Sequence, residues 1–190
     1  LVYHTQKHQL NLGRIETITG SMFSGKTEEL ILRLRKAQIA RKRIQTFKPT
    51  TDARYSNRHI VSHNNTKIEA DVVARAEEIL KMLHKNTEVI GIDEGQFFNE
   101  DLIAICTEMA NKGKRIIVSG LDTDFSGKPF GPMPQLLAVS DHITKRLAKC
   151  KRCGNPATRT QRLVTSTALF LIGGSDKYEA RCRLCFKPSS

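Results

Sequence analysis

The feature that most constrains this chain is the segment Gly20-Ser21-Met22-Phe23-Ser24-Gly25-Lys26-Thr27, which fits the pattern G-x-x-x-x-G-K-[ST]. It follows an alternating, strand-like run at Arg14–Thr19 and precedes a helical pattern at Glu28–Ala40. In that context the backbone N–H groups of the loop point at phosphates, and the positive end of the helix dipole adds to them. Lys26 is expected to reach the β- and γ-phosphates, and the Thr27 hydroxyl to help hold Mg²⁺. The loop therefore predicts binding of a nucleoside triphosphate.

Short apolar runs alternate with helical patterns along the first three-quarters of the chain. Strands are expected at Ile44–Lys48, Val89–Asp93 and Arg115–Ser119, and further helices at Glu77–His84 and Asp101–Asn111. Strands separated by helices indicate a parallel α/β sheet flanked by helices, as in P-loop nucleoside triphosphatases. Pro49–Asn65 is polar and is expected to form a loop. The helix at Glu28–Ala40 is expected to bury one apolar face, made of Leu30, Ile31, Leu34 and Ala37.

An acidic pair, Asp93-Glu94, ends the apolar run Val89–Ile92. In phosphate-loop proteins a buried strand of this kind delivers an aspartate to magnesium. Glu94 points to a different side, where a carboxylate beside the transferred phosphate can take the proton of an acceptor hydroxyl or activate a water. The first case is a kinase and the second an ATPase. The alternative is an acidic pair that only ends a strand.

Four of the five cysteines form two C-x-x-C pairs, Cys150/Cys153 and Cys182/Cys185. Four thiolates can close a tetrahedral Zn²⁺ site with no open position, so the pattern predicts a structural zinc site. Redox pairs, or reduced cysteines without a metal, are the alternatives. The fifth, Cys106, lies in an apolar stretch and is expected to be buried and inert.

Near Lys149 the sequence changes from alternating apolar runs to cysteine pairs with glycine, proline and a Thr/Arg-rich segment, so we expect two domains. Residues 12–148 would form the nucleotide-binding domain, and residues 149–190 a small zinc-binding domain. Residues 1–11 lack the apolar stretch of a secretory signal and are expected to be a disordered leader. Cysteine pairs in a chain without such a signal indicate a reducing compartment, so a cytoplasmic location is expected.

Composition narrows the class of protein. Hydrophobic residues make up 39% and charged residues 26%, which are globular proportions. No apolar run approaches the ~20 residues that span a bilayer, which argues against a membrane protein. The net charge is +12, and it is unevenly placed. Ile31–Arg54 holds eight basic residues and one acidic residue, and Thr144–Lys187 holds eleven basic residues and two acidic residues. Such stretches favour an anionic partner, either nucleic acid or nucleotide phosphates, with a solvated basic face as the alternative.

Weaker signals lie between these motifs. The Gly/Pro-rich segment Gly120–Pro134 carries Phe125 and Phe130, which could stack on a base or pack against the sheet. Gly173-Gly174 could form a hinge. Arg54 could reach phosphate or be a solvated surface residue.

The motifs together resemble the zinc-containing thymidine kinase family. The matching pieces are GSMFSGKT, FKPTTDARYS, DEGQFF, GLDTDFSGKPFGP, TQRL and LIGGSDKYEARCRLC, in the family's order from Gly13 to Cys185. The resemblance implies transfer of the γ-phosphoryl group of ATP to the 5′-hydroxyl of thymidine, or of deoxyuridine, with Mg²⁺. It also implies a homotetramer, inhibition by dTTP, and neither nucleic acid nor membrane as a partner.

The resemblance also implies residue roles. Glu94 would be the general base, Tyr178 would contact the sugar 3′-hydroxyl, and the segment Leu169–Gly173 would close over the base as a lasso-like loop. Donor phosphates and Mg²⁺ would be held by Gly20 to Thr27, by Asp52, Ala53 and Arg54, and by Asp93, Glu94, Gly95 and Gln96. The thymine pocket would be lined by Met22, Phe97, Leu121, Phe125, Phe130, Thr160, Leu169, Phe170, Leu171, Ile172 and Gly173. Cys153 and Cys182 would tether the two ends of the closing segment.

Two other functions fit parts of the sequence. A zinc-ribbon nucleic-acid-binding ATPase would use the basic stretches on a phosphate backbone. Against it, the chain has no tryptophan and no basic helix with interleaved stacking aromatics. A regulatory nucleotide-binding module without turnover fits poorly with Asp93-Glu94.

Overall fold

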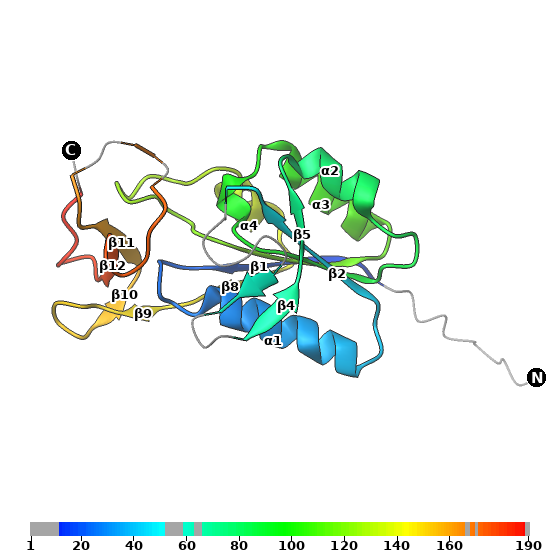
Figure 1. Ribbon diagram of the computed structural model, residues 1–190, viewed down its shortest axis with the longest axis horizontal. Helices are drawn as coiled ribbons and strands as arrows, with labels where there is room; N and C mark the ends of the chain where they lie inside the picture. Colours follow the sequence, from blue (N-terminus) through cyan, green and yellow to red (C-terminus); the bar gives the residue numbers. More distant parts are fainter. Residues whose placement is uncertain (1–11, 52–58, 63–65, 166–167, 170, 189–190) are drawn as a thin grey trace, which may run out of the picture.

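Six strands form the central sheet, and every neighbouring pair is parallel. The computed structural model describes residues 12–51, 59–62, 66–165, 168–169 and 171–188 (Figure 1). The strand order is β5-β2-β6-β7-β1-β8. The strands are β1 (Arg14–Thr19), β2 (Ile44–Pro49), β5 (Asp71–Val73), β6 (Val89–Ile92), β7 (Arg115–Gly120) and β8 (His142–Lys145).

Helices cover both faces of this sheet. In Figure 1, α1 lies below the sheet, and α2, α3 and α4 lie above it. Successive side chains of a strand point to opposite faces of the sheet, so each strand packs against both helical layers. In β7, Ile116 and Val118 belong to one hydrophobic cluster and Ile117 belongs to the other. The helices are α1 (Lys26–Ile39), α2 (Ala76–Met82), α3 (Asp101–Asn111) and α4 (Met133–Val139), with the 3₁₀ turn η1 at Gly95–Phe97.

Helix α1 packs close to the sheet. Its buried residues are Leu30, Ile31, Leu34 and Ala37, as the 3.6-residue period predicts. Gly91 in β6 makes this approach possible, because a Cβ there would lie 2.7 Å from Leu34 Cδ1. The helix that follows the phosphate loop is therefore fixed against the middle of the sheet.

A buried carboxylate stabilises the start of β1. Glu16 is 4% exposed and accepts hydrogen bonds from Arg14 (2.8 Å), Arg33 (2.9 Å) and Arg115 (2.7 Å). Burial alone would raise the pKa of Glu16, but the hydrogen bonds and charges of Arg115 and Arg14 lower it to about 2. The ionised carboxylate is thus part of the folded structure.

Glu16→Gln is expected to lower the free energy of unfolding by about 2–4 kcal/mol at pH 7, because the arginines lose their counter-charge. Since the pKa is depressed in the folded state, this stabilisation is present above about pH 4.5 and is lost as the pH falls toward 2. Urea denaturation of both proteins at pH 7 and pH 3 measures it. Equal stability of the two at pH 7 would contradict the assignment.

Within the described ranges, three short pairs of antiparallel strands lie outside this sheet. Strands β3 (His59–Val61) and β4 (Lys67–Glu69) pair beside the sheet. Farther along the chain, β9 (Ala148–Lys149) pairs with β10 (Pro156–Ala157), and β11 (Arg159–Arg162) pairs with β12 (Tyr178–Arg181). These last four strands lie together at one end of the molecule (Figure 1).

Most predicted elements are confirmed, with shifts of one or two residues at their ends. One expectation was wrong, and some elements were not predicted. Pro49–Asn65 is not entirely loop, because Pro49 ends β2 and His59–Val61 forms β3. The edge strand β8 was not predicted, because Ile143 is its single apolar residue and is itself 54% exposed.

Two further expectations concern burial and membranes. Cys106 is fully buried, as expected, and this burial raises the pKa of its thiol to about 12. In the described ranges, no helix combines the length and the apolar character needed to cross a bilayer.

Candidate active site

The phosphate loop connects β1 to α1 and is shaped by two left-handed residues, Phe23 (φ 63°) and Gly25 (φ 79°). Gly25 precedes the helix, and no side chain caps the first turn. The first N–H groups of an α-helix have no partner within the helix itself. Among the described residues, the buried hydroxyls of Ser21 and Ser24 also have no hydrogen-bond partner. Buried hydroxyls without a partner, on a loop that leads into the N-terminus of α1, fit a bound polyphosphate.

Lys26 and Thr27 lie where the loop motif requires them. The Nζ of Lys26 donates to the carbonyl oxygen of Ser21, 2.9 Å away, so the side chain folds back over the loop. The hydroxyl of Thr27 donates to Oδ2 of Asp93 at 3.3 Å. A hydroxyl and a carboxylate oxygen this close are hard ligands of the kind that Mg²⁺ prefers, so these residues fit a magnesium ion bound with a nucleotide.

Glu94 follows Asp93 in a left-handed conformation (φ 51°, ψ 43°) at the start of η1. This backbone turn separates the directions of the two carboxylates. Gln96, 2% exposed, donates to Oε2 of Glu94 (2.6 Å) and accepts from the backbone N–H of Leu121 (2.9 Å). Gln96 therefore fixes the Glu94 carboxylate relative to the end of β7.

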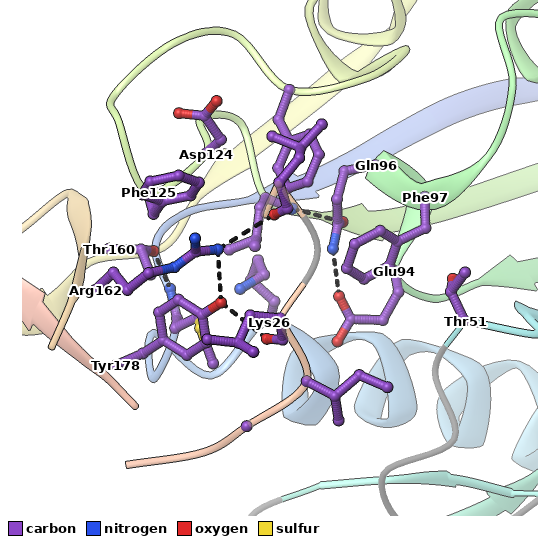
Figure 2. Close-up of a pocket in the computed structure, with 17 residues that line it drawn as sticks. Lys26, Thr51, Glu94, Gln96, Phe97, Asp124, Phe125, Thr160, Arg162 and Tyr178 are labelled. Carbon is purple, nitrogen blue, oxygen red and sulfur yellow. Dashed lines mark hydrogen bonds between the residues drawn. The ribbon is translucent and has the colours of Figure 1, made fainter. Parts of the chain in front are cut away.

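A cavity of about 230 Å³ lies beside the phosphate loop. Figure 2 shows Glu94 and Gln96 on one side of it, Tyr178, Thr160 and Arg162 on the other, and Lys26 between them. The cavity is lined by Met22, Lys26, Thr51, Glu94, Gln96, Phe97, Leu121, Asp124, Phe125, Phe130, Thr160, Arg162, Leu169, Leu171, Ile172, Gly173 and Tyr178.

Aromatic rings form much of the wall. Phe97 and Phe130 meet edge to face, with ring centroids 5.7 Å apart and an interplanar angle of 86°. Phe125 lies under the guanidinium of Arg162. Largely apolar walls with a few polar groups are typical of a site for a small, mostly neutral ring system.

Strand β11 joins this cavity to the phosphate loop. The backbone N–H of Met22, within the loop, donates to Oγ1 of Thr160 at 3.0 Å. Two residues along the strand, Arg162 contacts Tyr178 of the paired strand β12. The lobe that carries the cysteines therefore contributes one side of the cavity.

The four cysteines of the two C-x-x-C pairs come together. Their sulfur atoms all lie within 4.8 Å of one another, and the Sγ atoms of Cys153 and Cys182 are 3.6 Å apart. A tetrahedral zinc site with Zn–S distances of ~2.3 Å has sulfurs ~3.8 Å apart. The cluster Cys150, Cys153, Cys182 and Cys185 can hold a metal ion, and its donor set fits zinc.

The thiols of this cluster differ in acidity. Burial opposes ionisation of Cys150, but backbone hydrogen bonds from Cys182, Cys153 and Arg152 lower its pKa to about 6. A backbone hydrogen bond from Cys185 lowers the pKa of Cys182. The pKa of Cys185 is raised to about 12, mainly by hydrogen bonds with the Cys182 and Cys153 side chains. At least one thiolate is thus available to capture a cation near neutral pH.

The structure brings most of the predicted site residues together. The predicted base-pocket residues that are described all line the cavity, and so does Tyr178. Lys26, Glu94 and Gln96 line it as well. The predicted site residues that are described but do not line it are Gly20, Ser21, Phe23, Ser24, Gly25, Thr27, Asp93 and Gly95. Asp52, Ala53, Arg54 and Phe170 lie outside the described residues. The roles assigned to all of these residues remain predictions.

Sequence reasoning missed three lining residues, Thr51, Asp124 and Arg162. One signal was available for Arg162, because it lies two residues after Thr160 and alternate residues of a strand share a face. Thr51 and Asp124 follow strands β2 and β7 within polar segments, and no periodic pattern marks them.

The fold and site define a phosphate-loop α/β protein whose loop fits a nucleoside triphosphate and whose four-cysteine cluster can hold a metal ion. The sequence profile described as thymidine kinase matches residues 13–186, and the chain belongs to the thymidine kinase family. The resemblance stated from the motifs is therefore confirmed.

Individual relatives agree with this assignment. The chain is 53% identical over 176 residues to a thymidine kinase of Bdellovibrio bacteriovorus, covering 93% of this chain and 86% of that protein. It is 50% identical over 182 residues to a thymidine kinase of Rhodothermus sp., covering 96% and 85%. Among solved structures, the Legionella pneumophila ATPase DotB matches with a TM-score of 0.43 at 16% identity, over 67% of this chain and 34% of that one, which adds nothing to the assignment.

Proposed function

We propose that this chain transfers the γ-phosphoryl group of ATP to the 5′-hydroxyl of thymidine, giving dTMP and ADP. The observation that carries the proposal is that Lys26 of the phosphate loop and Glu94 line the same largely apolar cavity. A phosphate donor on the loop and a neutral nucleoside in the cavity would therefore meet at these two residues. Membership of the thymidine kinase family and relatives of that name support the choice of acceptor.

In this proposal each polar residue has one task. Lys26 and the loop amides hold the donor phosphates and offset the charge of the transferred group. Thr27 and Asp93 would hold Mg²⁺, which when bound adds positive charge at the phosphate oxygens. Glu94 accepts the proton of the 5′-hydroxyl as its oxygen attacks the γ-phosphorus in line with the departing ADP. Gln96 holds the Glu94 carboxylate in place through the 2.6 Å hydrogen bond.

The cavity walls would select the acceptor. Met22, Phe97, Leu121, Phe125, Phe130 and Thr160 would surround the thymine base, and Leu169–Gly173 would close over it. Tyr178 would contact the sugar 3′-hydroxyl. Deoxyuridine differs from thymidine by one methyl group, and a single methyl changes binding by only ~1 kcal/mol, so deoxyuridine is expected to be a weaker acceptor.

The proposal extends to the metal and to regulation. The cysteine cluster would hold a structural Zn²⁺ that stabilises a small domain at residues 149–190, with the nucleotide-binding domain at residues 12–148. The roles proposed for Asp52, Ala53, Arg54, Gly95 and Phe170 follow from family membership. A homotetramer, inhibition by dTTP and a cytoplasmic location belong to the same proposal.

ADP release from Mg²⁺-ATP in the presence of thymidine, of DNA, or of neither tests the reaction. We expect ADP that depends on thymidine and is matched one to one by dTMP. ADP release driven by DNA and indifferent to thymidine would overturn the proposal in favour of a nucleic-acid-dependent ATPase. Release equal in all three conditions would indicate hydrolysis without an acceptor.

A further inference from the structure

We propose that Arg162 is a positioning residue that fixes the backbone of the closing segment over the cavity and thereby sets which base is accepted. This inference rests on the function proposed above. It concerns a residue that the sequence motifs gave no role, on a strand that also contacts the phosphate loop.

Arg162 binds the closing segment through its guanidinium group. The side chain belongs to a residue only 4% exposed, and its Nη1 donates to the carbonyl oxygen of Ala168 at 2.6 Å. Its Nη2 donates to the carbonyl oxygen of Leu169 at 3.3 Å and to Oη of Tyr178 at 3.0 Å. The Tyr178 hydroxyl in turn donates to the carbonyl oxygen of Leu171 at 2.8 Å. Two side chains thus hold three main-chain carbonyls.

The same guanidinium lies against an aromatic wall. Its Cζ is 3.4 Å from the centroid of the Phe125 ring and 5.4 Å from that of Tyr178. Figure 2 shows the guanidinium between these two rings. Arg162 is therefore where the loop that carries Phe125, strand β12 and the closing segment meet.

Strand β11 links this arrangement to the donor side. Thr160, two residues before Arg162, accepts the hydrogen bond from the Met22 backbone in the phosphate loop. In the register of β11 and β12, Arg162 is paired with Tyr178. A displaced Arg162 would release the carbonyls of the closing segment while β11 stays held at Thr160, so acceptor binding should suffer more than ATP binding.

The shape of the guanidinium is what this role requires. Arginine offers five N–H donors in a planar fork, so it can donate to separate acceptors while its flat face packs on a ring. A lysine ammonium keeps the charge but cannot do both. Closing-segment geometry should consequently depend on the fork and not on the positive charge alone.

The test compares R162M and R162K with R159M, which removes an arginine at the other end of the same strand. In R162M we expect the KM for thymidine to rise about 10- to 100-fold, as for the loss of charge-assisted hydrogen bonds. The KM for ATP and the metal content should stay within about twofold. The ratio of kcat/KM for thymidine over deoxycytidine should fall, and R162K should restore only part of both losses. R159M should match the unsubstituted chain.

Each remaining outcome decides the inference. A folded, metal-loaded R162M with unchanged thymidine KM and base selectivity overturns it, and so does full recovery of both by R162K. Should R162M fail to fold, R162K alone decides, because unchanged KM and selectivity there exclude a role for the planar fork. If the unsubstituted chain does not phosphorylate thymidine, the proposed function fails and this inference with it. If the unsubstituted chain phosphorylates thymidine and the Arg162 variants keep its thymidine KM and base selectivity, this inference fails while the proposed function stands.

Discussion

Replacing Glu94 with glutamine is expected to lower kcat for thymidine phosphorylation by about 10²- to 10⁴-fold, the range that general base catalysis supplies. Glutamine keeps the size of the side chain, and its amide oxygen can still accept the hydrogen bond that Gln96 donates at 2.6 Å. It cannot accept the proton of the 5′-hydroxyl. Because Lys26, Thr27 and the loop amides are unchanged, ATP should bind with its ordinary affinity.

Steady-state kinetics and direct titration of ATP separate these two effects. E100Q is a matched control, since Glu100 is an exposed glutamate that precedes α3 and does not line the cavity. It should retain full turnover. A kcat of E94Q near that of the unsubstituted chain would remove Glu94 as the base, and a loss of ATP binding would point instead to a role in holding the donor.

Replacing Cys153 with alanine is expected to abolish stoichiometric metal binding and to raise the KM for thymidine at least about tenfold. Cys153 lies between β9 and β10, and its Sγ is 3.6 Å from that of Cys182, which follows β12. Strands β11 and β12 flank the closing segment, so the cluster holds the ends of that segment together. Because metal-binding energy becomes folding energy in a small lobe, the loss of one ligand should loosen the whole wall.

Metal analysis, the KM values for thymidine and ATP, and thermal unfolding measure this. C106A serves as the control, because Cys106 is buried in the α3 layer away from the cluster and its loss should leave metal content unchanged. A metal-free C153A with an ordinary thymidine KM would show that the cluster does not support the closing segment. Retention of one metal per chain would show that three thiols suffice.

The parts of this fold that the sequence predicts are those marked by local patterns. The apolar positions of α1 recur at helical spacing, so Leu30, Ile31, Leu34 and Ala37 identify its buried face without any knowledge of the sheet. Edge strands carry no such pattern, because their outer side faces solvent. This is why β8, with a single exposed isoleucine, was missed.

For the site, the sequence by itself determined the chemistry of each part: a phosphate loop, a following acidic pair and four cysteines at metal-ligand spacing. Each of these motifs can be recognised in the sequence because a few neighbouring residues set the backbone conformation of the loop or the spacing of the ligands. Only the tertiary structure decided how the parts combine. It placed Lys26 and Glu94 on one cavity, tied Thr160 to the phosphate loop, and buried Arg162 among three acceptors. An arginine on a short polar strand resembles a solvated residue until distant segments fold over it, because two of its three acceptors are backbone carbonyls, which no side-chain pattern reveals.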